Sequence, residues 1–445
     1  MIFSSFFKRR KLDYSDEPAG ETAMKPEQPN ARAKSAGTGL PRFQDRATGA
    51  SRRPLRNPIR ARMRSAFTPT QPVSNVAMFA GRRETLLTLI RSIEDQEIHV
   101  VIYGDRGIGK TSLLHVTAYL AREAGYLVRY VSCSESSEFG ETFRRIASDI
   151  PQIYHNEIDP TSQRAEQGAT LAELLPEGQV SVAAVSELFS KLTGTRFLII
   201  LDEFDRSDSE KFRRQIAELI KTLSDQSTRV QLVIAGVAGN LTELIQHIPS
   251  IRRNVIGLPV PNMLEPEIRE LIEIGSRACG LPYAEEACAM IVRLANGSPY
   301  LTSLLAQHAG VAALDRSAMR VEVADLLVAL SRSIAEIEQR VAPETLHNFS
   351  QIADTKTLAV LTEISREALA MGGRIRATPS GDGVDEALYT NALQALDTRF
   401  NLLRPTPLAP GGGYEFRDDG AALYFWLYSA YQRETRSKWR GEAAA

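Results

Sequence analysis

The stretch Gly104-Asp-Arg-Gly-Ile-Gly-Lys110-Thr111 decides the fold of this 445-residue chain. It follows the apolar, β-branched run 98–103, which predicts a buried parallel strand, and it precedes the amphipathic stretch 111–124, which predicts a helix. Glycines at this spacing let backbone N–H groups wrap a phosphate, and the start of the helix adds the positive end of its dipole. A chance glycine-rich turn needs neither the strand nor the helix, so the stretch predicts a phosphate-binding loop.

The chemistry of such a loop assigns a role to its last residues. Lys110 would bridge the β- and γ-phosphates of ATP, and the hydroxyl of Thr111 would hold Mg²⁺. The residues expected around the nucleotide phosphates are Gly104, Asp105, Arg106, Gly107, Ile108, Gly109, Lys110, Thr111 and Ser112.

A second motif lies at the end of the apolar run 197–201, where Asp202 and Glu203 follow directly. A central parallel strand would bring both carboxylates to the edge of the sheet where ligands bind. Asp202 would then hold Mg²⁺ through its water shell, and Glu203 would polarise the attacking water; the alternative is an acidic strand end without a catalytic role. Asp205 and Arg206 follow, either as a local ion pair or as part of a subunit contact.

Alternating strands and helices from residue 76 to 262 predict an α/β fold, a P-loop NTPase αβα sandwich with a parallel sheet. The pattern is purely helical from 263 to 343, which indicates a helical lid. Residues 344–445 read as helices followed by a two-stranded wing, which predicts a C-terminal winged-helix domain. Residues 1–75 lack helical or strand periodicity and predict a disordered basic arm.

Taken together, Phe79-x-Gly81-Arg82, the phosphate loop, Leu-Asp202-Glu203 and the run ending at Asn240 resemble the AAA+/STAND group of P-loop ATPases. Within that group they are most similar to bacterial origin-recognition-like ATPases. The resemblance covers about residues 79–310. It implies that Phe79, Gly81 and Arg82 line the adenine side and that Asn240 is a polar sensor after the fourth strand. Asn240 is equally suited to start a helix.

The resemblance has two further implications. An arginine finger, which reaches a neighbour's γ-phosphate, is expected just before the last strand, at Arg252 or Arg253; surface arginines near a helix end are the alternative. Pro299, in Asn296-Gly297-Ser298-Pro299-Tyr300, resembles the STAND proline that packs near adenine. No sensor arginine starts this lid helix, which favours a nucleotide-controlled switch with slow ATP hydrolysis over a fast motor.

Charge separates the arm from the rest of the chain. Residues 1–75 hold 15 Lys/Arg and 6 Asp/Glu, and residues 42–64 alone hold eight arginines. This arginine-rich stretch is either a solvated linker or a contact for an anionic surface, with DNA as one candidate. Phenylalanines beside a basic cluster in residues 2–11 allow an anionic membrane contact, with a plain flexible tip as the alternative.

The remaining features concern compartment and partners. No stretch is apolar enough to span a membrane, and the three cysteines lack metal-ligand spacing, so a cytoplasmic, possibly membrane-peripheral protein is expected. The expected recognition helix of the winged-helix domain, 384–400, is net acidic, so this domain is expected to contact protein, not DNA. We therefore expect a switch that acts on a protein partner or on its own assembly.

Overall fold

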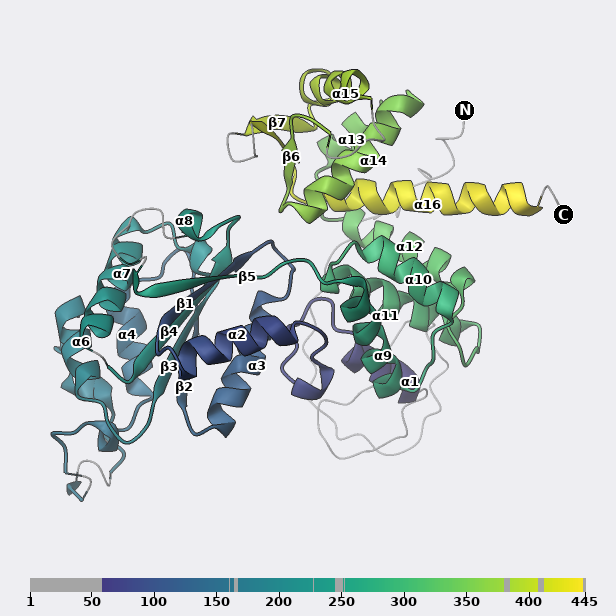
Figure 1. Cartoon of the computed structure of the whole chain (residues 1–445). Coiled ribbons are helices and arrows are strands. Elements are labelled where there is room, and N and C mark those ends of the chain that lie inside the picture. The colour runs from purple at the N-terminus through teal and green to yellow at the C-terminus, as the bar shows by residue number, and fades with distance from the viewer. Residues whose placement is uncertain are drawn as a thin grey trace, which may run out of the picture. The chain divides into compact units, whose positions relative to one another are not determined.

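The computed structural model describes residues 58–159, 161–163, 167–226, 228–244, 251, 253–379, 385–406 and 412–442 (Figure 1). Several positions discussed above lie outside the described residues. These are residues 2–11, most of the arginine-rich stretch 42–64, Arg252 and the first residue of the expected helix at 384–400.

A five-stranded parallel sheet forms the centre of the first domain, with the strand order β2-β3-β4-β1-β5. The strands are β1 (His99–Gly104), β2 (Leu127–Ser132), β3 (Phe197–Asp202), β4 (Val230–Val237) and β5 (Val255–Pro259). Every residue of β3 is buried, because this strand has a neighbour on each side and helices on both faces. The predicted parallel sheet is confirmed.

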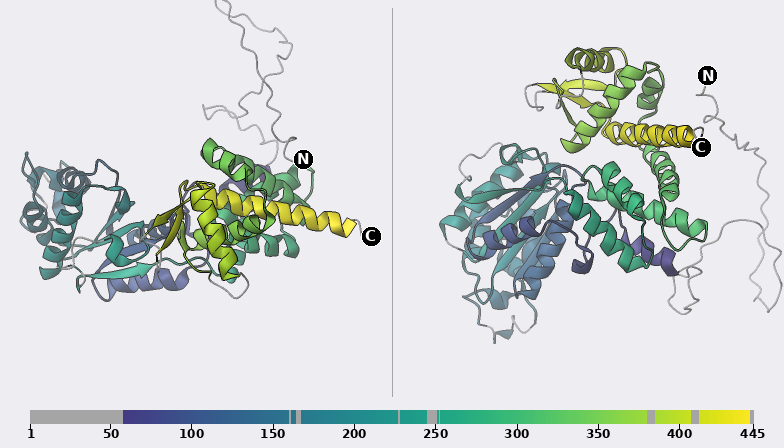
Figure 2. Two further views of the ribbon diagram at one scale, coloured as in Figure 1. Left: turned by 90° about the horizontal axis from the view of Figure 1, so that it is seen from above. Right: turned by 45° about the vertical axis from the view of Figure 1, so that its right-hand side comes forward.

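Helices cover both faces of this sheet (Figures 1 and 2). Val100 and Ile102 of β1 share a buried cluster with residues of α2 (Arg83–Glu94) and α3 (Lys110–Glu123). Val101, which points to the opposite face, belongs to a second cluster with the remaining helices. These are α4 (Phe139–Ser148), α6 (Val182–Ser190) and α7 (Glu210–Asp225). The alternation of side chains along one strand therefore divides the core into two layers, which gives the αβα sandwich.

Short elements fill the connections of this domain. They are η1 (Val76–Met78), η2 (Gln152–Tyr154), η3 (Leu171–Leu174), η4 (Phe204–Arg206) and α8 (Leu241–Leu244). The insertion expected near 151–180 holds η2 and η3, and Leu171 and Leu175 anchor it in the second cluster.

The lid consists of α9 (Glu265–Cys279), α10 (Glu285–Ala295), α11 (Pro299–Asp315) and α12 (Val323–Glu338). A fifth helix, α1 (Pro58–Ala66), packs on α9 and α11, although no regular structure is expected from the sequence there. Its Met63 and the following Phe67 are fully buried in the lid core. They fit because Gly275 and Gly310 have no side chains; an added Cβ would lie 2.3 Å from the Phe67 ring or the Met63 methyl.

The C-terminal residues form α13 (Pro343–Ser350), α14 (Thr355–Ala370), β6 (Arg374–Arg376), α15 (Glu386–Thr398), β7 (Leu403–Thr406), β8 (Gly413–Phe416) and α16 (Ala421–Glu442). The sheet is antiparallel with the order β6-β8-β7, so it has three strands where two are expected. The short β6 buries only Ile375 between two arginines, too little apolar pattern for a sequence-based assignment. The winged-helix assignment of this domain stays a prediction.

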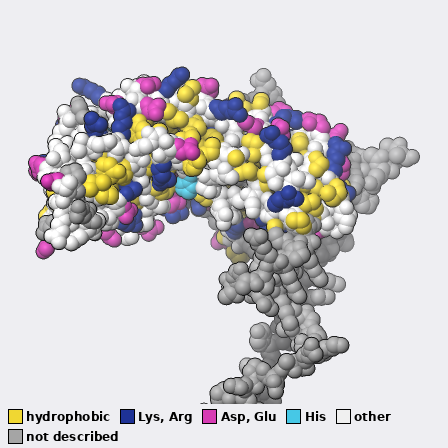
Figure 3. All heavy atoms as spheres, turned by 90° about the horizontal axis from the view of Figure 1, so that it is seen from below, with side chains coloured by type: hydrophobic (Ala, Val, Ile, Leu, Met, Phe, Trp, Pro, Cys, Tyr) yellow, Lys and Arg dark blue, Asp and Glu magenta, His cyan; other side chains and the backbone are white. Residues whose placement is uncertain are grey.

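Charged side chains of both signs are interspersed over the face in Figure 3, with apolar side chains between them. Among the described helices, none is both long enough and apolar enough to cross a membrane.

Candidate nucleotide site

The loop between β1 and α3 has the backbone conformation that phosphate binding requires. Gly104, Gly107 and Gly109 all have positive φ, with values of 151°, 75° and 99°. At Gly104 a side chain is excluded by space as well, because an added Cβ would lie 2.7 Å from the carbonyl oxygen of Val260. The loop therefore runs close to the backbone after β5 and turns its N–H groups toward the start of α3.

Lys110 opens α3 and folds back over the loop. Its Nζ donates hydrogen bonds to the carbonyl oxygens of Gly104 and Asp105, both over 2.8 Å. Burial lowers the pKa of Lys110, and the nearby carboxylates of Asp205, Asp105 and Asp202 act in the opposite direction. A buried ammonium held above the loop is placed to neutralise phosphate oxygens.

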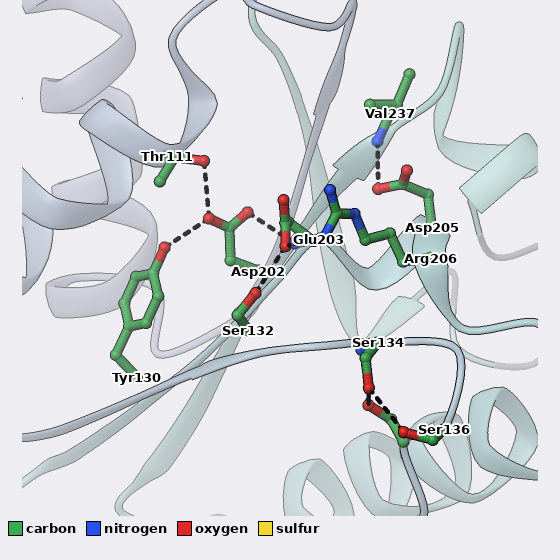
Figure 4. A network of polar contacts seen from close by, with 11 residues as sticks. Thr111, Tyr130, Ser132, Ser134, Ser136, Asp202, Glu203, Asp205, Arg206 and Val237 are labelled. Atoms are coloured by element: carbon green, nitrogen blue, oxygen red, sulfur yellow. Dashed lines mark hydrogen bonds and ion pairs between the residues drawn. The ribbon is translucent and has the colours of Figure 1, made fainter. Parts of the chain in front are cut away.

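Thr111 and Asp202 meet at the position predicted for Mg²⁺. The Thr111 hydroxyl donates to Oδ2 of Asp202 over 2.8 Å, and the Glu203 N–H donates to Oδ1 over 2.8 Å (Figure 4). A hydroxyl and a carboxylate within hydrogen-bond distance are the oxygen donors that Mg²⁺ uses beside nucleotide phosphates, so these two residues fit the ion.

Tyr130 is a residue of this site that the sequence analysis missed. Its hydroxyl also donates to Oδ2 of Asp202, over 2.5 Å, from the neighbouring strand β2. Burial and this hydrogen bond raise the pKa of Tyr130, so the phenol stays protonated and acts as a donor. The only available signal was a polar residue near the end of a strand predicted to lie at the same sheet edge.

Glu203 is engaged by two side chains. Its Oε2 accepts a hydrogen bond from Ser132 over 2.7 Å and lies 3.1 Å from Nη1 of Arg206 (Figure 4). Glu203 also has a left-handed backbone, with φ of 53°, which is uncommon for a residue with a side chain. Arg206 thus pairs with Glu203, whereas Asp205 accepts a hydrogen bond from the Val237 N–H. This arrangement replaces the Asp205–Arg206 ion pair considered from the sequence.

A pocket lies on the other side of the phosphate loop. It contains about 540 Å³ including its open mouth, within the range of roughly 300–1,000 Å³ that small-molecule sites occupy. Its lining residues are Ala66, Thr68, Val73, Met78, Phe79, Ala80, Arg82, Ile108, Gly109, Ser112, Met263, Leu271, Pro299 and Ser303. Phe79, Arg82 and Pro299, all predicted beside adenine, thus line one pocket, and Gly81 follows in the same turn.

The wall from residue 66 to 73 was not expected from the sequence. The Val73 N–H donates to the Ser112 hydroxyl over 3.0 Å, which ties this segment to the first turn of α3. The segment contributes to the pocket because α1 fixes its start on the lid.

Other candidates lie outside this arrangement or at its edge. Arg106 and Arg253 are exposed, and Arg252 lies outside the described residues. Asn240 is exposed and stands directly before α8, after β4 has ended. The arginine-finger and sensor roles therefore stay predictions.

The parallel sheet, the loop after β1 and the carboxylates after β3 define a P-loop nucleotide-binding protein. Residues 79–234 match the family described as AAA ATPase domain. This segment, which holds both phosphate motifs, is an AAA ATPase domain, and the AAA+ resemblance is confirmed.

Three solved structures illustrate the similarity of the fold. The Aeropyrum pernix Orc1 protein in complex with DNA is 17% identical, with a TM-score of 0.43, over 82% of this chain and 96% of that chain. The Walker-type ATPase of Pyrococcus abyssi is 16% identical, with a TM-score of 0.46, over 80% and 98%. The Thermotoga maritima RuvB Holliday junction branch migration motor is 15% identical, with a TM-score of 0.41, over 77% and 94%. A comparison with curated proteins found no match.

Proposed function

We propose that this chain binds and hydrolyses ATP with Mg²⁺ and works as a nucleotide-controlled switch of AAA+/STAND type. The observation that carries the proposal is the 2.8 Å contact between the Thr111 hydroxyl and the Asp202 carboxylate, beside the buried Lys110. It brings the two phosphate motifs, 91 residues apart in sequence, to one point. The switch would act on a protein partner or on the protein's own assembly.

The chain's own residues divide the work of hydrolysis. The loop N–H groups and Lys110 hold the β- and γ-phosphates, and Thr111 and Asp202 hold Mg²⁺, which neutralises charge on those phosphates. Glu203 orients a water molecule and accepts its proton. To do so, its carboxylate leaves Ser132 and Arg206, which engage it in this structure.

Two features support slow, controlled turnover over continuous motor activity. The engaged Glu203 needs a rearrangement before it can act on water. The start of α11 offers Pro299 to the nucleotide instead of an arginine, and Pro299 Cγ lies 3.7 Å from the position of a Cβ added to Gly109. The lid therefore reaches the phosphate loop through an apolar residue, which responds to the presence of nucleotide without adding charge to its transition state.

A titration with a fluorescent ATP analogue, with and without Mg²⁺, tests the nucleotide site. Lys110→Ala is expected to abolish binding, and Asp202→Asn is expected to remove the Mg²⁺ dependence. Unchanged affinity in Lys110→Ala would refute the assignment. Light scattering on the purified protein, with and without ATP and Mg²⁺, then tests the assembly: an ATP-dependent increase in mass supports self-assembly, and an unchanged mass favours a separate protein partner.

A second candidate function, DNA-associated regulation through residues 42–64, has one supporting observation. Helix α1 pairs Arg60 with Asp315 and leaves Arg62 and Arg64 exposed, so two arginines of this stretch are held in place on the lid. DNA binding that weakens steeply with salt and disappears in the double variant Arg62→Gln/Arg64→Gln supports this function. Binding that survives deletion of residues 1–57 together with that double substitution refutes it.

A further inference from the structure

The turn before α2 places two backbone N–H groups side by side. Gly81 and Arg82 both have left-handed backbones, with φ of 62° and 54°. Successive residues of unusual turn conformation can direct their N–H groups toward one anion. Here the anions belong to the lid: Gly81 donates to Glu270 Oε2 over 2.9 Å, and Arg82 donates to Glu267 Oε1.

Glu267 is fixed at the start of the lid. Its second carboxylate oxygen accepts a hydrogen bond from the Leu264 N–H over 2.8 Å, which caps the first turn of α9. The fit to the turn is close, since a Cβ added to Gly81 would lie 2.7 Å from Glu267 Cβ. Glu267 therefore connects the beginning of α9 to the turn before α2.

The side chain of Arg82 extends away from the lid to the phosphate loop. Its Nη2 donates to the carbonyl oxygen of Ile108 over 2.7 Å, and only 6% of Arg82 is exposed. Burial lowers the pKa of Arg82 to about 10, with Glu267 opposing the shift, so the guanidinium remains charged at neutral pH. Ile108 stands between Gly107 and Gly109, the two flexible positions of the loop.

We propose that Arg82 is a positioning residue that couples the lid to the phosphate loop and thereby sets how long a nucleotide stays bound. Its backbone N–H is held by Glu267 of the lid, and its guanidinium holds the Ile108 carbonyl, so that the loop N–H groups face the phosphates. When the lid moves away, Arg82 loses its backbone partner and the loop loses its support. This role rests on the proposed nucleotide function and differs from the adenine contact expected from the sequence.

Stopped-flow release of a fluorescent ADP from the full chain tests the coupling, with Arg83→Met as the matched control. Arg83 is the next residue, its side chain is 83% exposed, and it pairs with Glu270 of the same lid helix. We expect Arg82→Met to release ADP about 10-fold faster or more, because a buried charged hydrogen bond is lost. Arg83→Met is expected to match the wild type, and Arg82→Lys is expected to restore most of the residence time.

Glu267→Ala and the double variant Arg82→Met/Glu267→Ala separate coupling from direct contact with the nucleotide. If the two residues act in series, the double variant releases ADP no faster than the faster single variant. Independent, multiplying effects would mean that Arg82 acts on the nucleotide itself and would overturn the proposal. Equal release from the Arg82→Met and Arg83→Met variants, with wild-type protein binding ADP, would overturn it alone. A wild-type protein that binds no nucleotide would refute the proposed function as well.

Discussion

The phenol of Tyr130 donates a hydrogen bond over 2.5 Å to the same Asp202 oxygen that accepts the Thr111 hydroxyl. This contact crosses from β2 to β3 and fixes the orientation of a carboxylate assigned to Mg²⁺. Such supporting hydrogen bonds commonly change metal affinity by about 10- to 100-fold when removed. We therefore expect Tyr130→Phe to raise the Mg²⁺ concentration for half-maximal ATP hydrolysis by about 10-fold.

The control for this variant is Tyr119→Phe. Tyr119 also donates to a carboxylate, that of Glu123, but on the exposed side of α3. Its removal is expected to leave the Mg²⁺ dependence unchanged. If Tyr130→Phe shows the wild-type Mg²⁺ curve, then the Tyr130 hydroxyl does not support the metal site.

Arg206 predicts a gain of activity when it is removed. Its ion pair with Glu203 spans 3.1 Å between partly exposed side chains, and such pairs contribute about 0–1 kcal/mol. Freeing Glu203 should therefore raise the turnover number of Arg206→Met by about two- to five-fold, provided that this rearrangement limits the rate. Steady-state ATP hydrolysis measures the effect. Arg214→Met, which breaks an exposed pair with Glu210, should change nothing, and a slower Arg206→Met enzyme would contradict the interpretation.

The sequence could predict the parts of the site that are local in the chain. The loop from Gly104 to Thr111 and the Asp202-Glu203 pair each follow one strand, so a single stretch carries both the motif and its structural context. Ser132 and Tyr130 reach the same carboxylates only because β2 pairs with β3, with Ser132 opposite Asp202. Strand order is a property of the whole sheet, and the local pattern of β2 did not reveal it.

Helix α1 was missed for a different reason. Arg60, Arg62 and Arg64 dominate its composition, whereas Met63 and Phe67, one helical turn apart, carry its packing. Two apolar residues among arginines are too few to indicate an amphipathic helix. The complementary signal lies far away in sequence, in Gly275 and Gly310, whose lack of side chains makes room for them.

The position of α1 predicts where the N-terminal segment becomes essential for stability. Phe67 is fully buried in the lid core, so Phe67→Ala should lower the free energy of unfolding by about 3–5 kcal/mol. Gly275→Ala should also destabilise, because its methyl group would meet the Phe67 ring. Urea unfolding followed by circular dichroism measures both.

Two truncations provide the control. Deletion of residues 1–57 leaves α1 intact and is expected to keep the wild-type unfolding midpoint, whereas deletion of residues 1–75 removes Met63 and Phe67 and is expected to lower it. Equal midpoints for the two truncations would show that α1 does not stabilise the lid.

His99 predicts how stability depends on pH. It is buried in β1, where its Nδ1 accepts a hydrogen bond from the Leu232 N–H over 2.9 Å, and burial lowers its pKa to about 4. The unfolded chain, with an imidazole pKa of about 6.5, therefore binds more protons than the folded chain between these two values, so stability is lost as the pH falls through this window. From pH 7 to 5 the loss assigned to His99 is about 2 kcal/mol. Urea unfolding at both pH values should show this loss in the wild type and in His347→Gln, whose histidine is exposed, but a smaller loss in His99→Asn. The same loss in His99→Asn would mean that other groups cause the pH dependence.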